Sequence, residues 1–347
     1  MKKIKIILTI FCLCFMDSRV EASAALMEGA QVLFRSMNRQ ARIVFPAKGP
    51  KSEDHLRVGL SQLTSRDMPF QCDEKALNEE GSPFKEYSNT HEARALDFMS
   101  ALEGEEDIIW GFAGGSGCLE VVHGIERSQK SFDRPKTLIG YSDMTFLLSY
   151  WAKKRWPAFH APVLGLTKVA DPVSKVGLNA DTTLDSIMDI LQGKTKSLTH
   201  EFEVISAGSS DSQLYEAENG VAGGNLMLVT ELMGTTLRID GENRFIFVED
   251  VESDPTYVLR KLKGLYRTGL FEKAKGLIVG DILPWKEEHQ ALTRDVLREF
   301  VEFTGFDLPV LYSTGFGHGS VNKVMPFNFA TRIQLKGEGK ADLTVDF

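Results

Sequence analysis

The sequence has little cysteine, no excess of positive charge and, beyond its first residues, no apolar run that approaches 18 residues. Four cysteines in 347 residues exclude a small disulfide-rich scaffold, and a net charge of −8 gives no general attraction to nucleic acid. The seven histidines form no zinc-binding pattern, and no glycine motif for nucleotides is complete, so no metal and no cofactor is expected. The 43% hydrophobic and 25% charged content is that of a globular chain, long enough for one large or two modest domains.

The first 24 residues have the pattern of a secretory signal peptide. Lys2, Lys3 and Lys5 precede an apolar run over residues 6–16, and Ala22-Ser23-Ala24 offers the small residues that a signal peptidase accepts. The run is too short to span a bilayer, so no membrane anchor is expected. A buried N-terminal strand is the alternative. The segment predicts an exported protein that is periplasmic or secreted after its removal.

Without this segment, Cys72 and Cys118 are the remaining cysteines. An oxidising compartment would permit a disulfide between them. Two free thiols are the alternative, because sequence does not show whether the two residues are close.

The first half of the chain alternates short apolar segments with amphipathic ones. Strands are expected at 41–46, 107–111 and 137–139, and helices at 55–63, 91–102, 119–127 and 144–154. Such alternation is typical of a parallel sheet covered by helices on both faces. The sequence therefore predicts an N-terminal α/β domain over residues 25–170.

The pattern changes after about residue 170. A helix is expected at 181–191, followed by a polar break at 206–212, and residues 171–214 are interpreted as a linker region. Short strands at 245–249, 276–279 and 333–335 surround a helix at 256–268. These features predict a second domain over residues 215–347, of the α+β or barrel-like kind.

Two local patterns point to chemistry. Residues 137–143 read as a strand, a sharp turn and a helix start, which would raise the Ser142 hydroxyl above the strand end. The second glycine of the Gly-x-Ser-x-Gly pattern is absent, because Met144 stands there, and a plain helix N-cap is the alternative for Ser142. His318 is flanked by the small residues of Gly315-Phe316-Gly317-His318-Gly319, which leave room for a substrate, although a surface histidine is the alternative.

Taken together and in order, these segments resemble the LD-carboxypeptidase family of serine peptidases, which includes muramoyl-tetrapeptide carboxypeptidases and microcin-immunity peptidases. The resemblance covers nearly the whole chain after the signal peptide. It is carried by the segments 45–50, 92–97, 113–117, 139–145, 223–226, 248–250, 257–262, 276–281 and 315–319.

The resemblance implies a Ser–His–Glu triad on Ser142, His318 and Glu249. Ser142 would attack the scissile carbonyl, His318 would move the proton, and Glu249 would fix the imidazole tautomer. Asp250 is the competing carboxylate, because it directly follows Glu249 in the sequence.

The resemblance also implies an oxyanion hole formed by the backbone amides of Gly115 and Asp143. Ser116 and Asn225 are expected as substrate contacts. In the family the glycine loop usually reads Arg-Gly-Gly-Tyr-Gly, whereas Ala113 and Ser116 stand here in place of the arginine and the tyrosine. Two interpretations of these differences are open: a different substrate specificity, or a loop that is supported by different packing.

The family's usual reaction implies a peptidoglycan tetrapeptide or a muropeptide as the substrate, with release of its terminal D-alanine. Two alternatives remain open at this level: an amidase for another substrate, such as a peptide–nucleotide antibiotic, and a non-catalytic peptidoglycan-binding protein. A homodimer is a further expectation from the family, and neither nucleic acid nor a membrane is expected as a partner.

Overall fold

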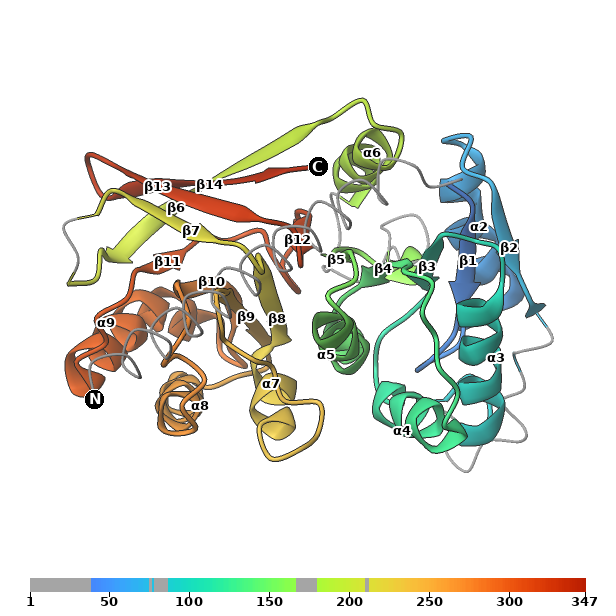
Figure 1. Cartoon of the computed structure of the whole chain (residues 1–347), viewed down its shortest axis with the longest axis horizontal. Coiled ribbons are helices and arrows are strands. Elements are labelled where there is room, and N and C mark those ends of the chain that lie inside the picture. Colours follow the sequence, from blue (N-terminus) through green and yellow to red (C-terminus); the bar gives the residue numbers. More distant parts are fainter. Residues whose placement is uncertain (1–38, 75–76, 78–86, 167–179, 210–211) are drawn as a thin grey trace, which may run out of the picture.

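The computed structural model describes residues 39–74, 77, 87–166, 180–209 and 212–347. The expected signal peptide, residues 1–24, lies outside these described residues. Figure 1 shows two sheets side by side, the first with α2–α5 around it and the second with α7–α9 against one face. This is the α/β architecture expected from the sequence, with a parallel N-terminal sheet and a nearly closed, barrel-like second sheet.

The first sheet has six strands in the order β12-β5-β4-β3-β1-β2. Its strands are β1 (Ala41–Val44), β2 (Phe70–Cys72), β3 (Ile108–Gly111), β4 (Thr137–Gly140), β5 (Ala158–His160) and β12 (Met325–Phe327). All pairs are parallel except β12 with β5. The accompanying helices are α2 (Glu53–Thr64), α3 (His91–Glu103), α4 (Cys118–Ser128) and α5 (Thr145–Lys154).

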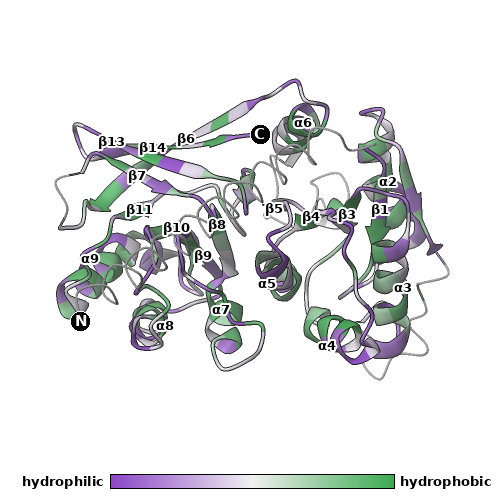
Figure 2. Ribbon diagram, in the orientation of Figure 1, coloured by the Kyte–Doolittle hydropathy of each residue, from purple (hydrophilic) through white to green (hydrophobic). Residues whose placement is uncertain are grey.

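Local sequence signals account for these elements. All four residues of β3 are buried, as in a strand covered on both faces. The Thr90 hydroxyl accepts a hydrogen bond of 3.2 Å from the Ala93 amide and thereby caps α3. Figure 2 shows the covering helices with hydrophobic and hydrophilic residues on different sides. Leu96 of α3 is 63% exposed, because the helix buries a neighbouring face.

The second sheet has eight strands in the order β7-β13-β14-β6-β11-β10-β9-β8. They are β6 (Ser197–Ser206), β7 (Leu214–Ala217), β8 (Val221–Asn225), β9 (Phe245–Val251), β10 (Gly276–Leu283), β11 (Val310–Tyr312), β13 (Thr331–Lys336) and β14 (Lys340–Asp346). Strands β8 to β11 are parallel, and α7 (Leu226–Leu232), α8 (Pro255–Arg267) and α9 (Thr293–Thr304) connect them. The remaining pairs are antiparallel.

The chain passes between the two sheets more than once. The range 171–214, interpreted from sequence as a linker, contains α6 (Ala180–Leu191) and β6, and β6 pairs with both β11 and β14 inside the second sheet. After β11 the chain leaves the second sheet, and β12 pairs with β5 of the first sheet, with Met325 opposite His160. The C-terminal part of the chain therefore contributes one strand to the first sheet.

Buried polar contacts fix one half of the molecule against the other. Arg244 donates 3.0 Å to the carbonyl of Ala152, and Asn328 donates 2.6 Å to the carbonyl of Trp156. One hydrophobic cluster runs from Trp110 in the first sheet into the second. Because such contacts leave little freedom at the junction, residues at the strand ends of the two sheets hold a fixed geometry.

Both cysteines expected after signal-peptide removal are free thiols, so the disulfide alternative is wrong. Cys72 ends β2, whereas Cys118 is fully buried at the start of α4 with its Sγ 3.8 Å from the sulfur of Met144. Burial raises the pKa of both thiols, to about 12 for Cys72, which disfavours the reactive thiolate.

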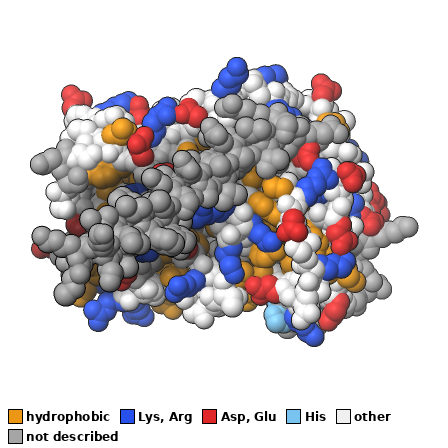
Figure 3. Space-filling model, viewed as in Figure 1, with side chains coloured by type: hydrophobic (Ala, Val, Ile, Leu, Met, Phe, Trp, Pro, Cys, Tyr) orange, Lys and Arg blue, Asp and Glu red, His pale blue; other side chains and the backbone are white. Residues whose placement is uncertain are grey.

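Within the described ranges, no helix has the length and apolar character needed to cross a membrane. The same residues contain no group of three or more His, Cys, Asp or Glu side chains placed to hold a metal ion. On the face shown in Figure 3, acidic and basic side chains are interspersed and do not gather into a patch of one sign.

Candidate active site

Ser142 lies on a strained turn immediately beyond β4. Its φ is +61°, in the left-handed region that a residue with a side chain rarely adopts. The Thr145 hydroxyl donates 2.7 Å to the Ser142 carbonyl and holds the turn as it enters a short 3-10 helix, Ser142–Met144. Ser142 is therefore more than the plain N-cap considered as its alternative: the turn lifts a partly exposed hydroxyl off the strand end.

His318 is carried by a glycine-rich loop that follows β11. Asp281, on β10, accepts 3.0 Å from the Gly315 amide, and the Asn322 side chain accepts 3.0 Å from the Gly317 amide. Gly317 has φ +127°, and a Cβ there would lie 2.5 Å from a Glu249 oxygen. Only glycine fits this position, so the loop can bring His318 down onto Glu249.

Glu249 and Asp250 are adjacent on β9, and the structure distinguishes them. Side chains alternate along a strand, so the two carboxylates point in different directions. Glu249 is fully buried and faces His318, whereas Asp250 accepts 2.9 Å from Asn225 and 2.6 Å from Ser253. Glu249 is the carboxylate that meets the imidazole.

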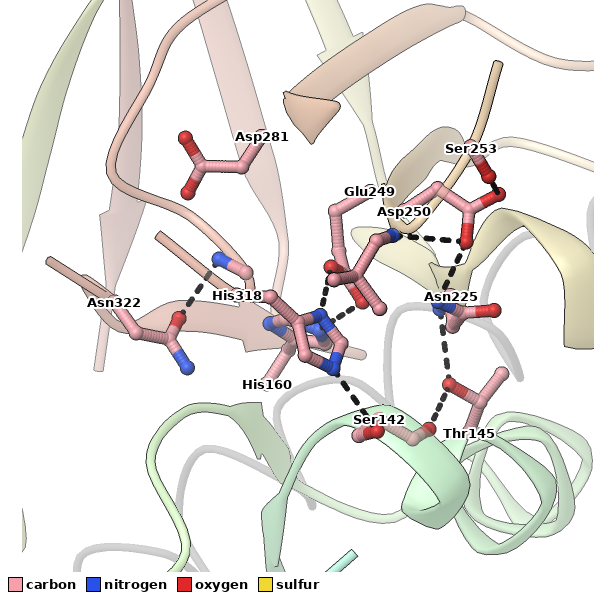
Figure 4. A network of polar contacts seen from close by, with 12 residues as sticks. Ser142, Thr145, His160, Asn225, Glu249, Asp250, Ser253, Asp281, His318 and Asn322 are labelled. Atoms are coloured by element: carbon pink, nitrogen blue, oxygen red, sulfur yellow. Dashed lines mark hydrogen bonds and ion pairs between the residues drawn. The ribbon is translucent and has the colours of Figure 1, made fainter. Parts of the chain in front are cut away.

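The structure brings Ser142, His318 and Glu249 into one hydrogen-bonded line, which Figure 4 shows. The Nδ1 atom of His318 is 2.6 Å from Oε2 of Glu249, and its Nε2 atom is 3.0 Å from Oγ of Ser142. An ionised carboxylate can only accept, so the imidazole proton belongs on Nδ1. Nε2 is then free to accept the proton of the serine hydroxyl.

The pKa shifts of Glu249 and His318 support an ionised carboxylate beside the imidazole. Burial would raise the pKa of Glu249, but His318 and His160 outweigh it and bring the value down to about 2. Burial lowers the pKa of His318, but the charge of Glu249 and its hydrogen bond raise it above the usual value of 6.5. A buried, ionised carboxylate thus makes the imidazole a stronger base.

The glycine loop lies directly against Ser142. A Cβ on Gly114 would stand 3.0 Å from the Ser142 Cβ and 3.3 Å from its Oγ. Gly115, expected in the oxyanion hole, is the next residue, exposed and with φ +112°; a Cβ there would meet the side chain of Lys48. Ser116, expected to contact substrate, is exposed on the same loop.

Two buried groups hold this loop in place. Arg94 of α3 is 2% exposed and donates to the carbonyls of Pro46 and Gly117, the latter at 2.7 Å. Asp143 accepts 2.8 Å from the Cys118 amide and so ties the turn that bears Ser142 to the start of α4. A guanidinium from α3 therefore supports the loop in which Ala113 stands in place of the family's usual arginine.

Asn225, the other residue expected to contact substrate, is 5% exposed and has structural partners. Its side chain caps α7 by accepting from the Leu228 amide and donates to Asp250, and its own amide donates 3.0 Å to Thr145. It links the turn that bears Ser142 to the strand that bears Glu249.

Sequence reasoning missed His160, the last residue of β5. It is fully buried, and its Nε2 is 3.7 Å from Oε1 of Glu249. The available signal was a histidine directly after the apolar pair Ala158-Phe159, at the carboxyl end of the strand next to β4. Sites in parallel sheets gather at such ends.

Comparison with known families and proteins identifies the fold and the family. Models of the LD-carboxypeptidase N-terminal and C-terminal domains match residues 42–161 and 219–333, together well over half of the chain. The chain belongs to the LD-carboxypeptidase family. This confirms the resemblance read from the sequence and the expectation of a carboxypeptidase.

Several members of this family are similar along most of their length. A putative carboxypeptidase of Rickettsia conorii is 28% identical over 310 residues, covering 87% of this chain and 90% of the relative. The murein tetrapeptide carboxypeptidase of Pseudomonas aeruginosa is 26% identical over 251 residues, covering 70% and 78%.

Solved structures share the fold of this LD-carboxypeptidase family member. The muramoyltetrapeptide carboxypeptidase of Oxalobacter formigenes has a TM-score of 0.67 at 20% identity, covering 88% of this chain and 99% of that one. The microcin immunity protein MccF, in complex with glutamyl sulfamoyl guanosine, has a TM-score of 0.67 at 17% identity, covering 90% and 97%.

Proposed function

We propose that this protein is a serine LD-carboxypeptidase that releases the terminal D-alanine from peptidoglycan tetrapeptide stems. The observation that carries the proposal is the line from Ser142 through His318 to Glu249, with distances of 3.0 and 2.6 Å. Family membership and the relatives named as murein tetrapeptide carboxypeptidases support the substrate class.

In the proposed reaction Ser142 attacks the amide carbonyl that precedes the terminal D-residue. His318 accepts the hydroxyl proton on Nε2 and returns it to the leaving amine of D-alanine. A water that His318 deprotonates then attacks the acyl-enzyme; the ester bond breaks, the proton returns to Oγ of Ser142, and the tripeptide acid leaves. Glu249 keeps the Nδ1 proton in place and stabilises the imidazolium formed in both steps.

The developing oxyanion requires donors beside Ser142. We assign them to the backbone amides of Gly115 and Asp143, each worth about 3 kcal/mol of barrier. The exposed backbone of Gly115 and the contact of its neighbour Gly114 with Ser142 support this assignment. Ser116, exposed on the same loop, is our candidate for a direct substrate contact.

A substrate panel tests the proposal. Purified protein lacking residues 1–24 is incubated with disaccharide-tetrapeptide and disaccharide-pentapeptide, and the products are measured by mass spectrometry. Conversion of tetrapeptide to tripeptide with no change in pentapeptide is expected, because the pentapeptide ends in a D,D-bond. Cleavage of the pentapeptide alone, or of neither peptide, would contradict the proposal.

A peptidyl-sulfamoyl nucleoside belongs in the same panel, because structures of MccF share this fold. Hydrolysis of that compound without tetrapeptide cleavage would favour the alternative amidase function. Binding of muropeptide without hydrolysis would favour the non-catalytic alternative.

We further propose that the protein is exported, on the basis of the lysines, the apolar run and the Ala-Ser-Ala site within residues 1–24. Expression of the full chain in a bacterial host and N-terminal sequencing of the periplasmic fraction test this. The expected mature terminus is Ala25, and an intact terminus in the cytoplasm would contradict export.

A further inference from the structure

The carboxylate of Glu249 has two oxygens, and the proposed triad uses only one of them. Oε2 pairs with His318, whereas Oε1 is buried with no hydrogen-bond partner among the described residues. A buried ionised oxygen without a donor is costly, so such an atom needs an explanation.

A second orphaned polar group lies opposite that oxygen. His160 is fully buried, and among the residues that the structure describes neither of its ring nitrogens has a hydrogen-bond partner. Its Nε2 faces Oε1 of Glu249 at 3.7 Å, and Figure 4 shows this contact beside the one from His318. A movement of less than 1 Å would bring the two atoms to hydrogen-bond distance.

The position of His160 is set by both halves of the molecule. It ends β5 and pairs in register with Gly140 of β4 and Met325 of β12. Its ring packs against three aromatic rings, at centroid distances of 5.8, 4.9 and 5.9 Å for Tyr141, Phe247 and Phe327 respectively. A phenylalanine would satisfy this packing, so packing alone does not account for a ring with two unpaired nitrogens.

We propose that His160 is a positioning residue that donates its Nε2 proton to Oε1 of Glu249, extending the line to Ser142–His318–Glu249–His160. With a donor on each oxygen, the carboxylate cannot rotate away from the Nδ1 proton of His318. The inference rests on the proposed function, since it assigns His160 a role in that triad. No covalent step is added.

Variants of His160 separate a hydrogen-bonding role from packing. His160→Phe keeps the aromatic contacts and removes the donor, while His160→Gln keeps a donor and removes the ring. We expect His160→Phe to lower kcat on the tetrapeptide about tenfold or more with little change in KM. His160→Gln should stay within about threefold of wild type.

The pH profile gives a readout that lost packing would not move. Without the second donor the Glu249 carboxylate becomes more basic, so the acidic limb of kcat/KM, set by His318, shifts to higher pH in His160→Phe. Among the described residues, Asp250, Asp281 and Tyr141 also interact electrostatically with Glu249 or His318. These stay in place in both variants, so a shift reports the lost donor.

His55→Phe is the matched control. His55 is also a buried histidine, 8% exposed and packed on a phenylalanine, but its Nε2 bonds the Gly165 carbonyl at 2.7 Å. This variant should lose stability and leave the pH profile unchanged. A His160→Phe protein with the wild-type kcat and acidic limb would overturn the proposal.

A measurement without substrate keeps the inference independent of the proposed reaction. In protein labelled with 15N-histidine, the ring nitrogen shifts of His160 report its tautomer. The proposal is supported if His160 carries its proton on Nε2 and if its ring nitrogen shifts change in the Glu249→Gln variant. This result stands even if the tetrapeptide is not cleaved or His160→Phe does not fold. A proton on Nδ1 with a bare Nε2 overturns it.

Discussion

Replacing Glu249 by Gln tests the electrostatic core of the account. The change preserves shape but removes the buried charge that faces His318 at 2.6 Å. The pKa of Glu249 is lowered from 4.5 to about 2, equivalent to about 3 kcal/mol of net preference for the ionised form.

If that stabilisation is lost when the imidazolium forms, the rate falls about 10²-fold. The new amide can also donate to Nδ1 and favour the wrong tautomer, so we expect a total loss of about 10³- to 10⁴-fold in kcat/KM. The assay is D-alanine release from disaccharide-tetrapeptide across pH 5–9.

The surviving activity of Glu249→Gln should show its acidic limb at lower pH, because the charge that raises the pKa of His318 is gone. Asp250→Asn is the matched control, since this neighbouring carboxylate bonds Asn225 and Ser253. It should cost stability and lose less than about tenfold in kcat/KM. Wild-type kcat/KM in Glu249→Gln, or an equal loss in both variants, would refute the reasoning.

Three further predictions concern the surroundings of the site. Gly114→Ala places a methyl group 3.0 Å from the Ser142 Cβ. We expect kcat/KM to fall about tenfold or more while the thermal midpoint moves by only a few degrees. Unchanged kinetics would show that the loop moves to accommodate the methyl group without displacing Ser142. Burial raises the pKa of Asp281 from 3.8 to about 6, so the stability linked to its protonated form is full below about pH 4 and is lost as pH rises through 6. Urea unfolding at pH 4.5 and 7.5 should therefore give a drop with pH that is about 2 kcal/mol smaller in Asp281→Asn, and an equal drop would contradict the assignment. Arg94→Met leaves buried carbonyls unpaired, including that of Gly117, and should lower the free energy of unfolding by about 3 kcal/mol in the same assay; a loss below about 1 kcal/mol would show that the loop does not depend on the guanidinium.

The sequence predicted those elements whose signals are local. Helix α3 begins at His91 as expected, because the Thr90 cap and the apolar spacing are both encoded within a few residues. The pairing of β12 with β5 was not predictable, since it joins three-residue strands far apart in the chain. Residues 197–206 were interpreted as linker for a similar reason: β6 owes its stability to neighbours contributed by distant segments.

The candidate site divides in the same way. The strand-turn-helix pattern around Ser142 was visible in the sequence, but its pairing with His318 and Glu249 was implied only by family resemblance. Sequence left Asp250 as a competitor, and strand alternation at β9 settles which acid faces the imidazole. His160 was missed because Glu249, the carboxylate that it faces, comes from the other sheet.

The most direct test of the central claim compares wild-type protein with Ser142→Ala on disaccharide-tetrapeptide, with D-alanine and tripeptide both measured by mass spectrometry. Matched thermal midpoints establish that both proteins are folded. The account predicts tripeptide and D-alanine in equal amounts from wild type and a rate at least about 10³-fold lower from Ser142→Ala. Comparable release by both proteins would contradict the assignment of Ser142 as the nucleophile.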